Sequence, residues 1–252
     1  MGEYELGGDA PGTGPGDRPA GGAVELWRLD TTREVVGGVR VDDGLLAGDG
    51  PGPSAGDGPG LLDAAERSRA ARLVRDLDRR RYLAAHVGLR VLLGGYLGVP
   101  PGEVALVRED CPGCGAPHGR PAPAGPFAGT LHFSLSHSGD VALMAFSGRP
   151  VGVDVEAVPD AEATADLVET LHPREAAELL ALPEAARPPL LGRVWARKEA
   201  YLKGTGMGLA KGLRDPYVGT AERPAPTPGW TVRDVTAPAG FAAAVAVAAG
   251  GV

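Results

Sequence analysis

The three lysines of this 252-residue chain, Lys198, Lys203 and Lys211, lie close together, whereas arginines carry the positive charge everywhere else. Arginine is a planar, permanently charged donor, while lysine is a compact ammonium that approaches a phosphate oxygen as a point charge. The lysine cluster therefore indicates a site that handles phosphate. A chance grouping of three lysines is the alternative interpretation.

Two carboxylates stand two residues apart in the segment VGVDVEAV, at Asp154 and Glu156. The segment alternates as a strand does, so both carboxylates lie on one face. Neighbouring carboxylates repel each other unless a cation lies between them, and oxygen ligands of this kind favour Mg²⁺, which also binds phosphates. The alternative is an ordinary strand with its polar face toward solvent.

A predicted helix at residues 188–203 places Trp195, Glu199 and Lys203 along one face, because they are spaced four apart. Glu199 could supply a third carboxylate, and Lys203 would point at the same phosphate region. Taken alone, the two form an ordinary surface ion pair. The glycine run at 204–208 ends the helix and permits close approach of a ligand. It neither follows a strand nor opens a helix, so it is no dinucleotide-binding fingerprint.

The segment FSLSHSG at residues 133–139 ends a predicted strand and enters a turn. His137 could offer a ring nitrogen, and the flanking serines their hydroxyls, to a phosphate. A nucleophilic serine with a histidine base is disfavoured, because the Gly-x-Ser-x-Gly elbow is absent. A structural histidine in the turn is a third interpretation.

Hydrophobic periodicity predicts the same order of elements twice. The first half has a strand at 24–29, helices at 63–75 and 78–97, and a hairpin of strands 131–136 and 141–147. The second has a strand at 151–158, helices at 160–172, 173–182 and 188–203, and a hairpin of strands 230–236 and 241–249. We therefore expect an α/β (α+β) fold of two similar subdomains, residues 23–150 and 151–252. The low-complexity segments 1–22 and 44–60 are expected to be disordered.

Composition bounds the function classes. The net charge is −7 and 43% of the residues are hydrophobic, which suits a soluble protein and argues against general affinity for nucleic acid. No apolar run approaches the roughly 20 residues of a membrane span, and the N-terminus lacks signal-peptide features, so we expect a cytoplasmic protein. A basic segment could receive an acidic ligand or partner; its arginines are Arg67, Arg69, Arg72, Arg75, Arg79, Arg80 and Arg81.

Three segments in this order resemble the signature motifs of the 4′-phosphopantetheinyl transferases. They are SLSHSG at 134–139, GVDVE at 152–156 and WARKEAYLKGTGMGL at 195–209. The length of two linked halves points to the surfactin-synthetase-activator (Sfp-type) class. The resemblance implies two α/β subdomains related by a pseudo-twofold axis, with coenzyme A bound at their junction. It also implies transfer of the phosphopantetheine arm to a serine of an acyl or peptidyl carrier protein, with release of adenosine 3′,5′-bisphosphate.

The resemblance also implies roles for individual residues. The Mg²⁺ ligands would be Asp154, Glu156 and Glu199, and Glu199 would also deprotonate the carrier serine, directly or through water. Lys203 would contact the pyrophosphate and stabilise the leaving group, while Lys198 would support its helix.

The remaining implied roles concern coenzyme A. Ser136 and His137 would lie near its 3′-phosphate, and Arg120, in the segment HGRP, would lie near its adenine. A looser alignment of the helical region makes Arg69 and Arg81 phosphate partners.

Cys111 and Cys114, with His118 nearby, resemble half of a zinc knuckle, but the chain has only these two cysteines. A zinc ion would need His118 and a fourth ligand from elsewhere, and a disulfide is disfavoured in a reducing cytoplasm. We expect a reduced loop that holds no stoichiometric zinc.

Two function classes remain. The first is an active, monomeric transferase that serves carrier proteins of fatty-acid, polyketide or nonribosomal peptide synthesis. The second is a binding module, either a degenerate transferase that holds carrier protein without turnover or an adaptor built around the cysteine loop. The three carboxylates and Lys203 favour the enzyme, since a binder would not need them. Carrier preference would depend on surface complementarity, which no motif here encodes.

Overall fold

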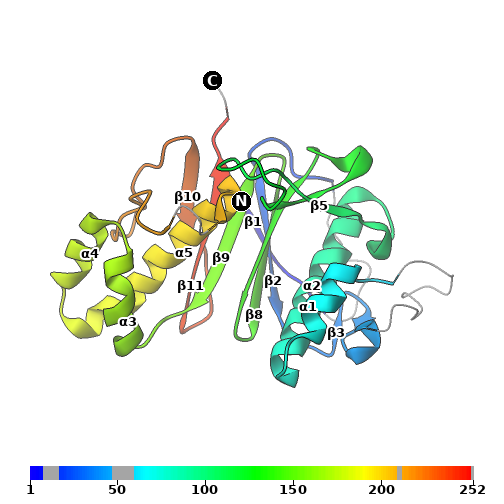
Figure 1. Cartoon of the computed structure of the whole chain (residues 1–252), viewed down its shortest axis with the longest axis horizontal. Helices are drawn as coiled ribbons and strands as arrows, with labels where there is room; N and C mark the ends of the chain where they lie inside the picture. Colours follow the sequence, from blue (N-terminus) through cyan, green and yellow to red (C-terminus); the bar gives the residue numbers. More distant parts are fainter. Residues whose placement is uncertain (8–16, 47–59, 209–211, 251–252) are drawn as a thin grey trace.

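The structure, a computed structural model, describes residues 1–7, 17–46, 60–208 and 212–250. Two sheets stand side by side in the middle of the molecule, and helices cover them at the two ends (Figure 1). The first sheet has the order β1 (Gly2–Glu5), β2 (Val24–Asp30), β8 (Val141–Ser147), β7 (His132–Ser138). The second has the order β10 (Trp230–Asp234), β11 (Phe241–Ala248), β9 (Val151–Ala157).

The helices fall into two groups. The first sheet packs against α2 (Asp76–Leu97), which α1 (Ala64–Ala71) contacts. The second sheet packs against α5 (Arg187–Thr205), and α3 (Ala161–Leu167) and α4 (Pro173–Leu180) pack on α5. Two short strand pairs lie outside the sheets, β3 (Val35–Val36) with β4 (Val39–Arg40) and β5 (Leu106–Arg108) with β6 (Pro121–Pro123). The 3₁₀ turns are η1 (Asp43–Leu46), η2 (Pro101–Glu103), η3 (Gly125–Phe127), η4 (Val168–Thr170) and η5 (Glu184–Ala186).

The same strand topology occurs in both halves. In each, the first strand pairs antiparallel with the last, and the last pairs antiparallel with the strand before it, as β2–β8–β7 and β9–β11–β10. The predicted α/β fold and the order of its elements are therefore confirmed. The division into subdomains at residues 150 and 151 stays a prediction.

Several predicted bounds shift. The predicted helix 63–75 ends at Ala71, although its predicted Asp start is confirmed: Asp63 and Glu66 form a reciprocal capping box. The predicted helix 160–172 is α3 followed by the single turn η4, because Leu171 adopts an extended conformation.

The expectation of disorder throughout 1–22 is wrong for Gly2–Glu5. These residues form a parallel edge strand on β2, and Tyr4 stacks on Trp27 with ring centroids 4.9 Å apart. The edge of β2 offers backbone donors and acceptors with which a short extended segment can pair. Of the predicted loop 44–60, residues 44–46 belong to η1. Residues 8–16 and 47–59 lie outside the described part of the chain.

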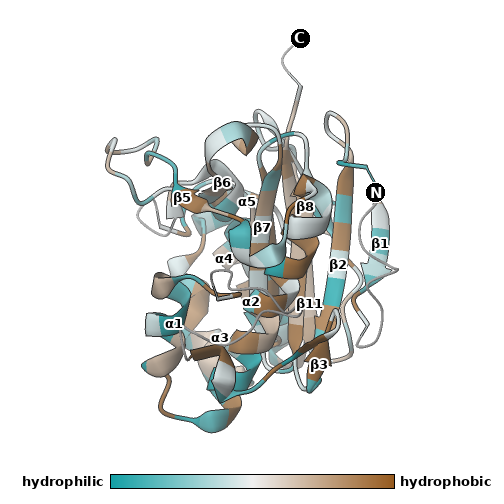
Figure 2. Cartoon of the chain, turned by 90° about the vertical axis from the view of Figure 1, so that its right-hand side faces the viewer, coloured by the Kyte–Doolittle hydropathy of each residue, from teal (hydrophilic) through white to brown (hydrophobic). Residues whose placement is uncertain are grey.

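Strand β8 is buried along its whole length because both of its faces are covered. The side chains on one face, such as Met144 and Phe146, pack with residues of β2 and α2 in one core. The other face packs Leu143 and Ala145 against Val153 of β9 and its neighbours on β11. In Figure 2, hydrophobic colour accordingly fills much of β8 and β11. This shared core holds the two halves together.

The seam between β7 and β9 is made by serine side chains. Ser134 Oγ accepts a hydrogen bond from the backbone N–H of Val153 at 3.1 Å, and Ser138 Oγ accepts one from Ala157 at 3.2 Å. These serines alternate along β7, so their hydroxyls share one face. They satisfy backbone donors of β9 that would otherwise be left without a partner at the junction.

Within the described part of the chain, no helix is both long enough and apolar enough to cross a membrane.

Candidate active site

Two glycines allow α5 to lie directly on β9. A Cβ added to Gly152 would lie 2.0 Å from the carbonyl oxygen of Ala200 and 2.3 Å from the backbone nitrogen of Gly204. A Cβ added to Gly204 would meet the Trp230 ring at 2.6 Å. Only glycine fits such an approach of two backbones. The close contact brings Glu199 and Lys203 of α5 over the acidic face of β9.

Asp154 lies at the centre of this site and is fully buried. Its Oδ1 accepts hydrogen bonds from Lys203 Nζ at 2.6 Å and from Ser136 Oγ at 2.8 Å. Its Oδ2 is buried and has no hydrogen-bond partner. A buried carboxylate oxygen without a partner is costly, so this atom requires a cation or a donor from outside the described chain.

Glu156 and Glu199 flank Asp154 and are half-buried. Burial raises the pKa of Glu156, and the negative charge of Asp154 raises it further, against a hydrogen bond from Ser138 and the charge of Lys203. Burial and then the charge of Asp154 also raise the pKa of Glu199, against the charge of Lys203. The three carboxylates therefore act on one another's charge beside a single lysine, although their oxygens do not all lie within 4.8 Å of one another. A divalent cation would neutralise this excess of negative charge.

Lys203 links the carboxylates to phosphate chemistry. Its ammonium donates to Asp154 and, at 2.8 Å, to Ser136 Oγ, which uses two of its three protons. The side chain stays one-third exposed and lines the neighbouring pocket. The third proton therefore remains available to an anion in that pocket.

A pocket of about 360 Å³ opens beside this site, between the two halves. Its wall comes from α2, from the segment around β5 and β6, from β7, and from the end of α5. None of the described residues that line it is acidic, and its basic and imidazole side chains are His86, Arg108, His118, Arg120, His137 and Lys203. This lining suits a polyanion.

His137 lines the pocket, as the sequence predicts, and its ring meets the Tyr82 ring edge-on at 6.4 Å between centroids. The residue stays exposed, but partial desolvation of its ring lowers its pKa, and the positive charges of His86, Lys203 and Arg69 lower it further. Arg69 is itself exposed on α1 and close enough to act on this ring. A phosphate placed here would be met by several positive groups.

Two predicted phosphate partners have other partners in the structure. Ser136 donates its only hydroxyl proton to Asp154, so in this arrangement it has none for a 3′-phosphate, and it stabilises the carboxylate site instead. Arg81 donates from Nε to Asp140 at 2.8 Å, in the turn after β7, and is not among the residues that line the pocket. A phosphate contact by Arg81 would require this ion pair to open.

Arg120 connects the two halves at the pocket wall. Its Nη1 donates to the Gly204 carbonyl at 2.7 Å, and its Nε lies 2.6 Å from Glu109 Oε2. The side chain thereby ties the β5–β6 segment to the end of α5. It lines the pocket, as the predicted adenine contact requires.

The lysines of the cluster have separate roles. Lys198 is fully buried and pairs with Glu175 at 2.8 Å, and it also donates to the Pro216 carbonyl. Burial lowers its pKa, against the attraction of Glu175. This confirms the prediction that Lys198 supports its helix. Lys211 lies outside the described residues, so Lys203 is the lysine that the described structure places at the site.

Two of the basic and imidazole side chains that line the pocket, His86 and Arg108, are not among the predicted site residues. His86 hydrogen-bonds Glu66 at 2.9 Å and stacks on Tyr82. It interrupts the apolar face of α2 one turn after Tyr82, and this interruption is the signal that could have revealed it. Arg108 donates to the Gly119 carbonyl at 3.1 Å, and no sequence pattern marks it.

Known proteins share this chain's second half and much of its first. A model of the 4′-phosphopantetheinyl transferase superfamily matches residues 150–246. The 4′-phosphopantetheinyl transferase HetI of Nostoc sp. is 36% identical over 193 residues, which are 74% of this chain and 78% of that protein. The chain belongs to the 4′-phosphopantetheinyl transferase superfamily.

Other members of the superfamily are also similar. The phosphopantetheinyl transferase of Thraustochytrium sp. is 36% identical over 61% of this chain and 55% of its own length. The 4′-phosphopantetheinyl transferase Sfp of Bacillus subtilis is 28% identical over 60% of this chain and 62% of its own length. The superfamily match includes β9 and α5, so all three carboxylates and Lys203 lie within it.

Proposed function

We propose that this superfamily member transfers the 4′-phosphopantetheine group of coenzyme A to a serine of apo acyl carrier or peptidyl carrier domains. The reaction is Mg²⁺-dependent and releases adenosine 3′,5′-bisphosphate. Membership of a superfamily of transferases supports the reaction class. The site supports its chemistry.

One observation carries the metal assignment: the buried Oδ2 of Asp154, which has no partner, lies on the strand face that also bears Glu156. The donor set of Asp154, Glu156 and Glu199 consists only of carboxylate oxygens, as Mg²⁺ prefers. The pKa values of Glu156 and Glu199 are raised by burial and then by the charge of Asp154, which supports a cation between them. The residues therefore fit the ion. When bound, Mg²⁺ would neutralise the pyrophosphate and stabilise the charge of the transferred phosphoryl group.

Glu199 acts as the general base. Its raised pKa makes it a better proton acceptor than an ordinary surface glutamate. It takes the proton of the carrier serine, directly or through water. The serine Oγ then forms a bond to the β-phosphorus of coenzyme A, while the bond from that phosphorus to the bridging oxygen breaks. The electron pair of this bond leaves with adenosine 3′,5′-bisphosphate.

Lys203 stabilises the charge that grows on the leaving group. Asp154 and Ser136 hold its ammonium by two hydrogen bonds, which fixes its position before substrate arrives. A preorganised donor of this kind costs no reorganisation at the moment of reaction. Phosphoryl transfer depends mainly on such positioning and electrostatics.

The pocket binds the nucleotide part of coenzyme A. His137, with Arg69 near it, receives the 3′-phosphate, and Arg120 lies against the adenine. All the proposed catalytic residues come from one chain, so we propose a monomer as the active species. We place the reaction in the cytoplasm.

The test is the mass of an apo carrier domain after incubation with this protein, coenzyme A and Mg²⁺. We expect a gain of about 340 Da, the mass of the transferred group. Asp154→Asn should abolish the gain, because it removes the charge from the central ligand. The matched control is Glu162→Gln, an exposed carboxylate on α3 that does not line the pocket, which should transfer as wild type does. Binding of the carrier domain by wild type without any mass gain would instead show a binding module.

A further inference from the structure

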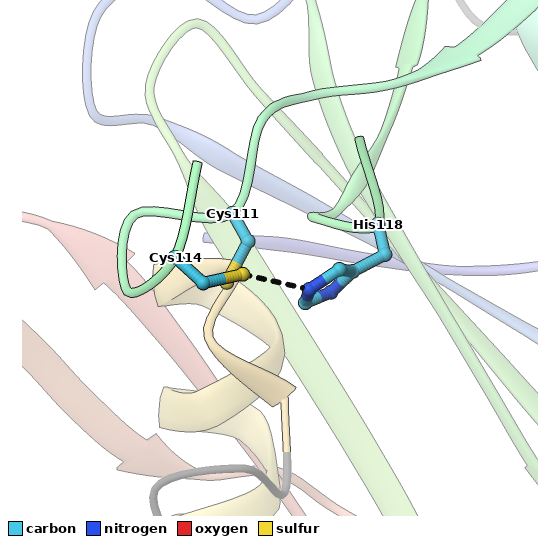
Figure 3. Close-up of side chains that lie close together, drawn as sticks. All are labelled: Cys111, Cys114 and His118. Carbon is cyan, nitrogen blue, oxygen red and sulfur yellow. Dashed lines mark hydrogen bonds between the residues drawn. The ribbon is translucent and has the colours of Figure 1, made fainter. Parts of the chain in front are cut away.

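Three side chains with metal-binding atoms gather on the loop before β6, outside the carboxylate site. Cys111, Cys114 and His118 place one ligand atom each within 4.8 Å of the others (Figure 3). Cys114 Sγ and His118 Nε2 lie 3.0 Å apart, and both cysteines are free. Among the described residues, this is the group of histidine, cysteine and acidic side chains whose ligand atoms all lie this close together.

The backbone of the loop builds this arrangement. Cys111 N donates to the Ala116 carbonyl at 2.8 Å, and Gly115 N donates back to the Cys111 carbonyl at 2.8 Å. Gly115 has φ +73°, a left-handed conformation that glycine adopts without strain and that turns the chain after Cys114. The N–H groups of Gly113 and Cys114 are directed at the Cys111 sulfur. These hydrogen bonds within the loop hold its two sulfurs near each other.

The donor set selects the metal. Two sulfurs and an imidazole are the ligands of Zn²⁺, whereas Mg²⁺ takes oxygen. In tetrahedral zinc, Zn–S and Zn–N bonds of about 2.3 and 2.1 Å place S and N about 3.6 Å apart and two sulfurs about 3.8 Å apart. The separation of 3.0 Å between Cys114 Sγ and His118 Nε2 is shorter than this S–N distance, and the other separations are at most 4.8 Å. Rotation of the exposed Cys114 and His118 side chains can supply the adjustment.

We propose that Cys111, Cys114 and His118 bind one Zn²⁺ ion, with water as the fourth ligand. The two thiols release their protons on binding, so the ion and its two thiolates are neutral together. Water fits the fourth position because Cys114 and His118 are exposed. The sequence alone predicts a reduced loop without zinc, since it offers no second cysteine pair; the geometry of the three side chains reverses that prediction.

The ion would stabilise the wall of the pocket. Pro112 Cδ lies 3.7 Å from where a Cβ at Gly206 would stand, and Met207 Cε lies 3.7 Å from where one at Gly113 would stand. The loop therefore rests on the end of α5, as Figure 3 shows, just beyond Lys203. His118 itself lines the pocket, two residues before Arg120.

The experiment measures metal content, so it does not depend on transferase activity. Protein purified without a metal-affinity column is loaded with zinc, dialysed and analysed by elemental mass spectrometry. We expect about one zinc per chain in wild type and at least a tenfold lower content in Cys114→Ser and in His118→Ala. The matched control is His132→Asn, a histidine of β7 outside the cluster, which should keep its zinc.

Two further readouts separate ligation from a folding defect. Cobalt-loaded wild type should show a sulfur-to-cobalt charge-transfer band and the intense visible bands of a tetrahedral ion, and both should be lost in Cys114→Ser. In buffer without Mg²⁺, a zinc-selective chelator should lower the melting temperature of wild type, zinc should restore it, and Cys114→Ser should respond to neither. Zinc content below a tenth per chain in loaded wild type, or an intact mass two hydrogens short that marks a Cys111–Cys114 disulfide, would overturn the proposal.

Discussion

Burial and the nearby charge of Asp154 act together on Glu156 and Glu199. Each is half-buried beside the buried charge of Asp154, and both have raised pKa values for that reason. A group with a raised pKa binds its proton more tightly in the folded state. Its contribution to stability is therefore present at low pH and is lost as the pH rises through the folded pKa.

The first prediction follows from this loss of stability with rising pH. With metal chelated, the melting temperature should fall as the pH is raised from acidic to neutral values, because Glu156 and Glu199 ionise beside Asp154. Mg²⁺ should reverse the fall, and its stabilising effect should grow over the same pH range. The measurement is thermal unfolding with chelator or with Mg²⁺ at a series of pH values. Glu156→Gln should flatten both trends, and an Mg²⁺ effect independent of pH would contradict the assignment.

The second prediction concerns Lys203. Replacing it with Met removes one preorganised electrostatic contact to the leaving group, which should cost about 3–4 kcal/mol, or a few hundredfold in kcat, with less effect on KM. The pH–rate profile of this variant should also shift to higher pH, because the charge of Lys203 lowers the pKa of Glu199. Steady-state kinetics across pH measures both effects.

Its controls test geometry as well as charge. Lys203→Arg keeps the charge, but a planar fork does not reach the same point between Asp154 and Ser136, so activity should recover only in part. Lys211→Arg should be nearly silent. Equal tolerance of arginine at both positions would show that the site needs only a positive charge.

At the scale of elements, the site depends on how closely α5 approaches β9. Side chains of a helix and of a strand reach one site only if the two backbones lie close together, which requires small residues where they touch. Gly152 and Gly204 supply that condition. On the other edge of β9, the backbone N–H groups of Val153 and Ala157 donate to serine hydroxyls of β7.

The third prediction is that Gly152→Ala lowers both stability and activity. Its Cβ would lie 2.0 Å from a backbone oxygen of α5, so the helix must shift, at a cost of about 1–3 kcal/mol or more. The matched control is Gly192→Ala on α5, where a Cβ meets its nearest atom at 3.5 Å, an ordinary contact. That variant should be neutral or about 0.5–1 kcal/mol more stable. Chemical denaturation measures the pair, and equal effects would refute the close-packing argument.

At the scale of the whole molecule, the pocket uses both halves. Its wall includes α2 and β7 from the first and α5 from the second, and Arg120 bridges them. A ligand bound there stabilises the folded state of both halves, by about 2.7 kcal/mol at a hundredfold excess over its Kd.

The fourth prediction uses this linkage. If His137 and Arg69 receive the 3′-phosphate as proposed, coenzyme A should raise the melting temperature of wild type more than dephospho-coenzyme A does. In His137→Ala the difference between the two ligands should shrink, while the response to dephospho-coenzyme A stays the same. Thermal shift titrations measure it. Undiminished discrimination by the variant would assign the 3′-phosphate to other residues.

Sequence by itself determined which residues share an element face. Asp154 and Glu156 lie two apart on a strand, and Glu199 and Lys203 lie four apart on a helix, so local periodicity places each pair correctly whatever the fold. The order of elements was predictable for the same reason, since each helix and strand carries its own hydrophobic pattern. Helix ends were less predictable, because they depend on local hydrogen bonds.

Only the tertiary structure decided which of these faces meet and which partners satisfy each group. Ser136 was predicted beside a phosphate but donates to Asp154, and Arg81 pairs with Asp140 across a turn. Lys198 is buried in an ion pair with Glu175 and is structural, whereas Lys203 lies at the site. Cys111, Cys114 and His118 share a metal-binding geometry that their spacing alone left open. Some of these pairings join side chains that are distant in the sequence, and others depend on the path of a loop. Local periodicity predicts neither kind.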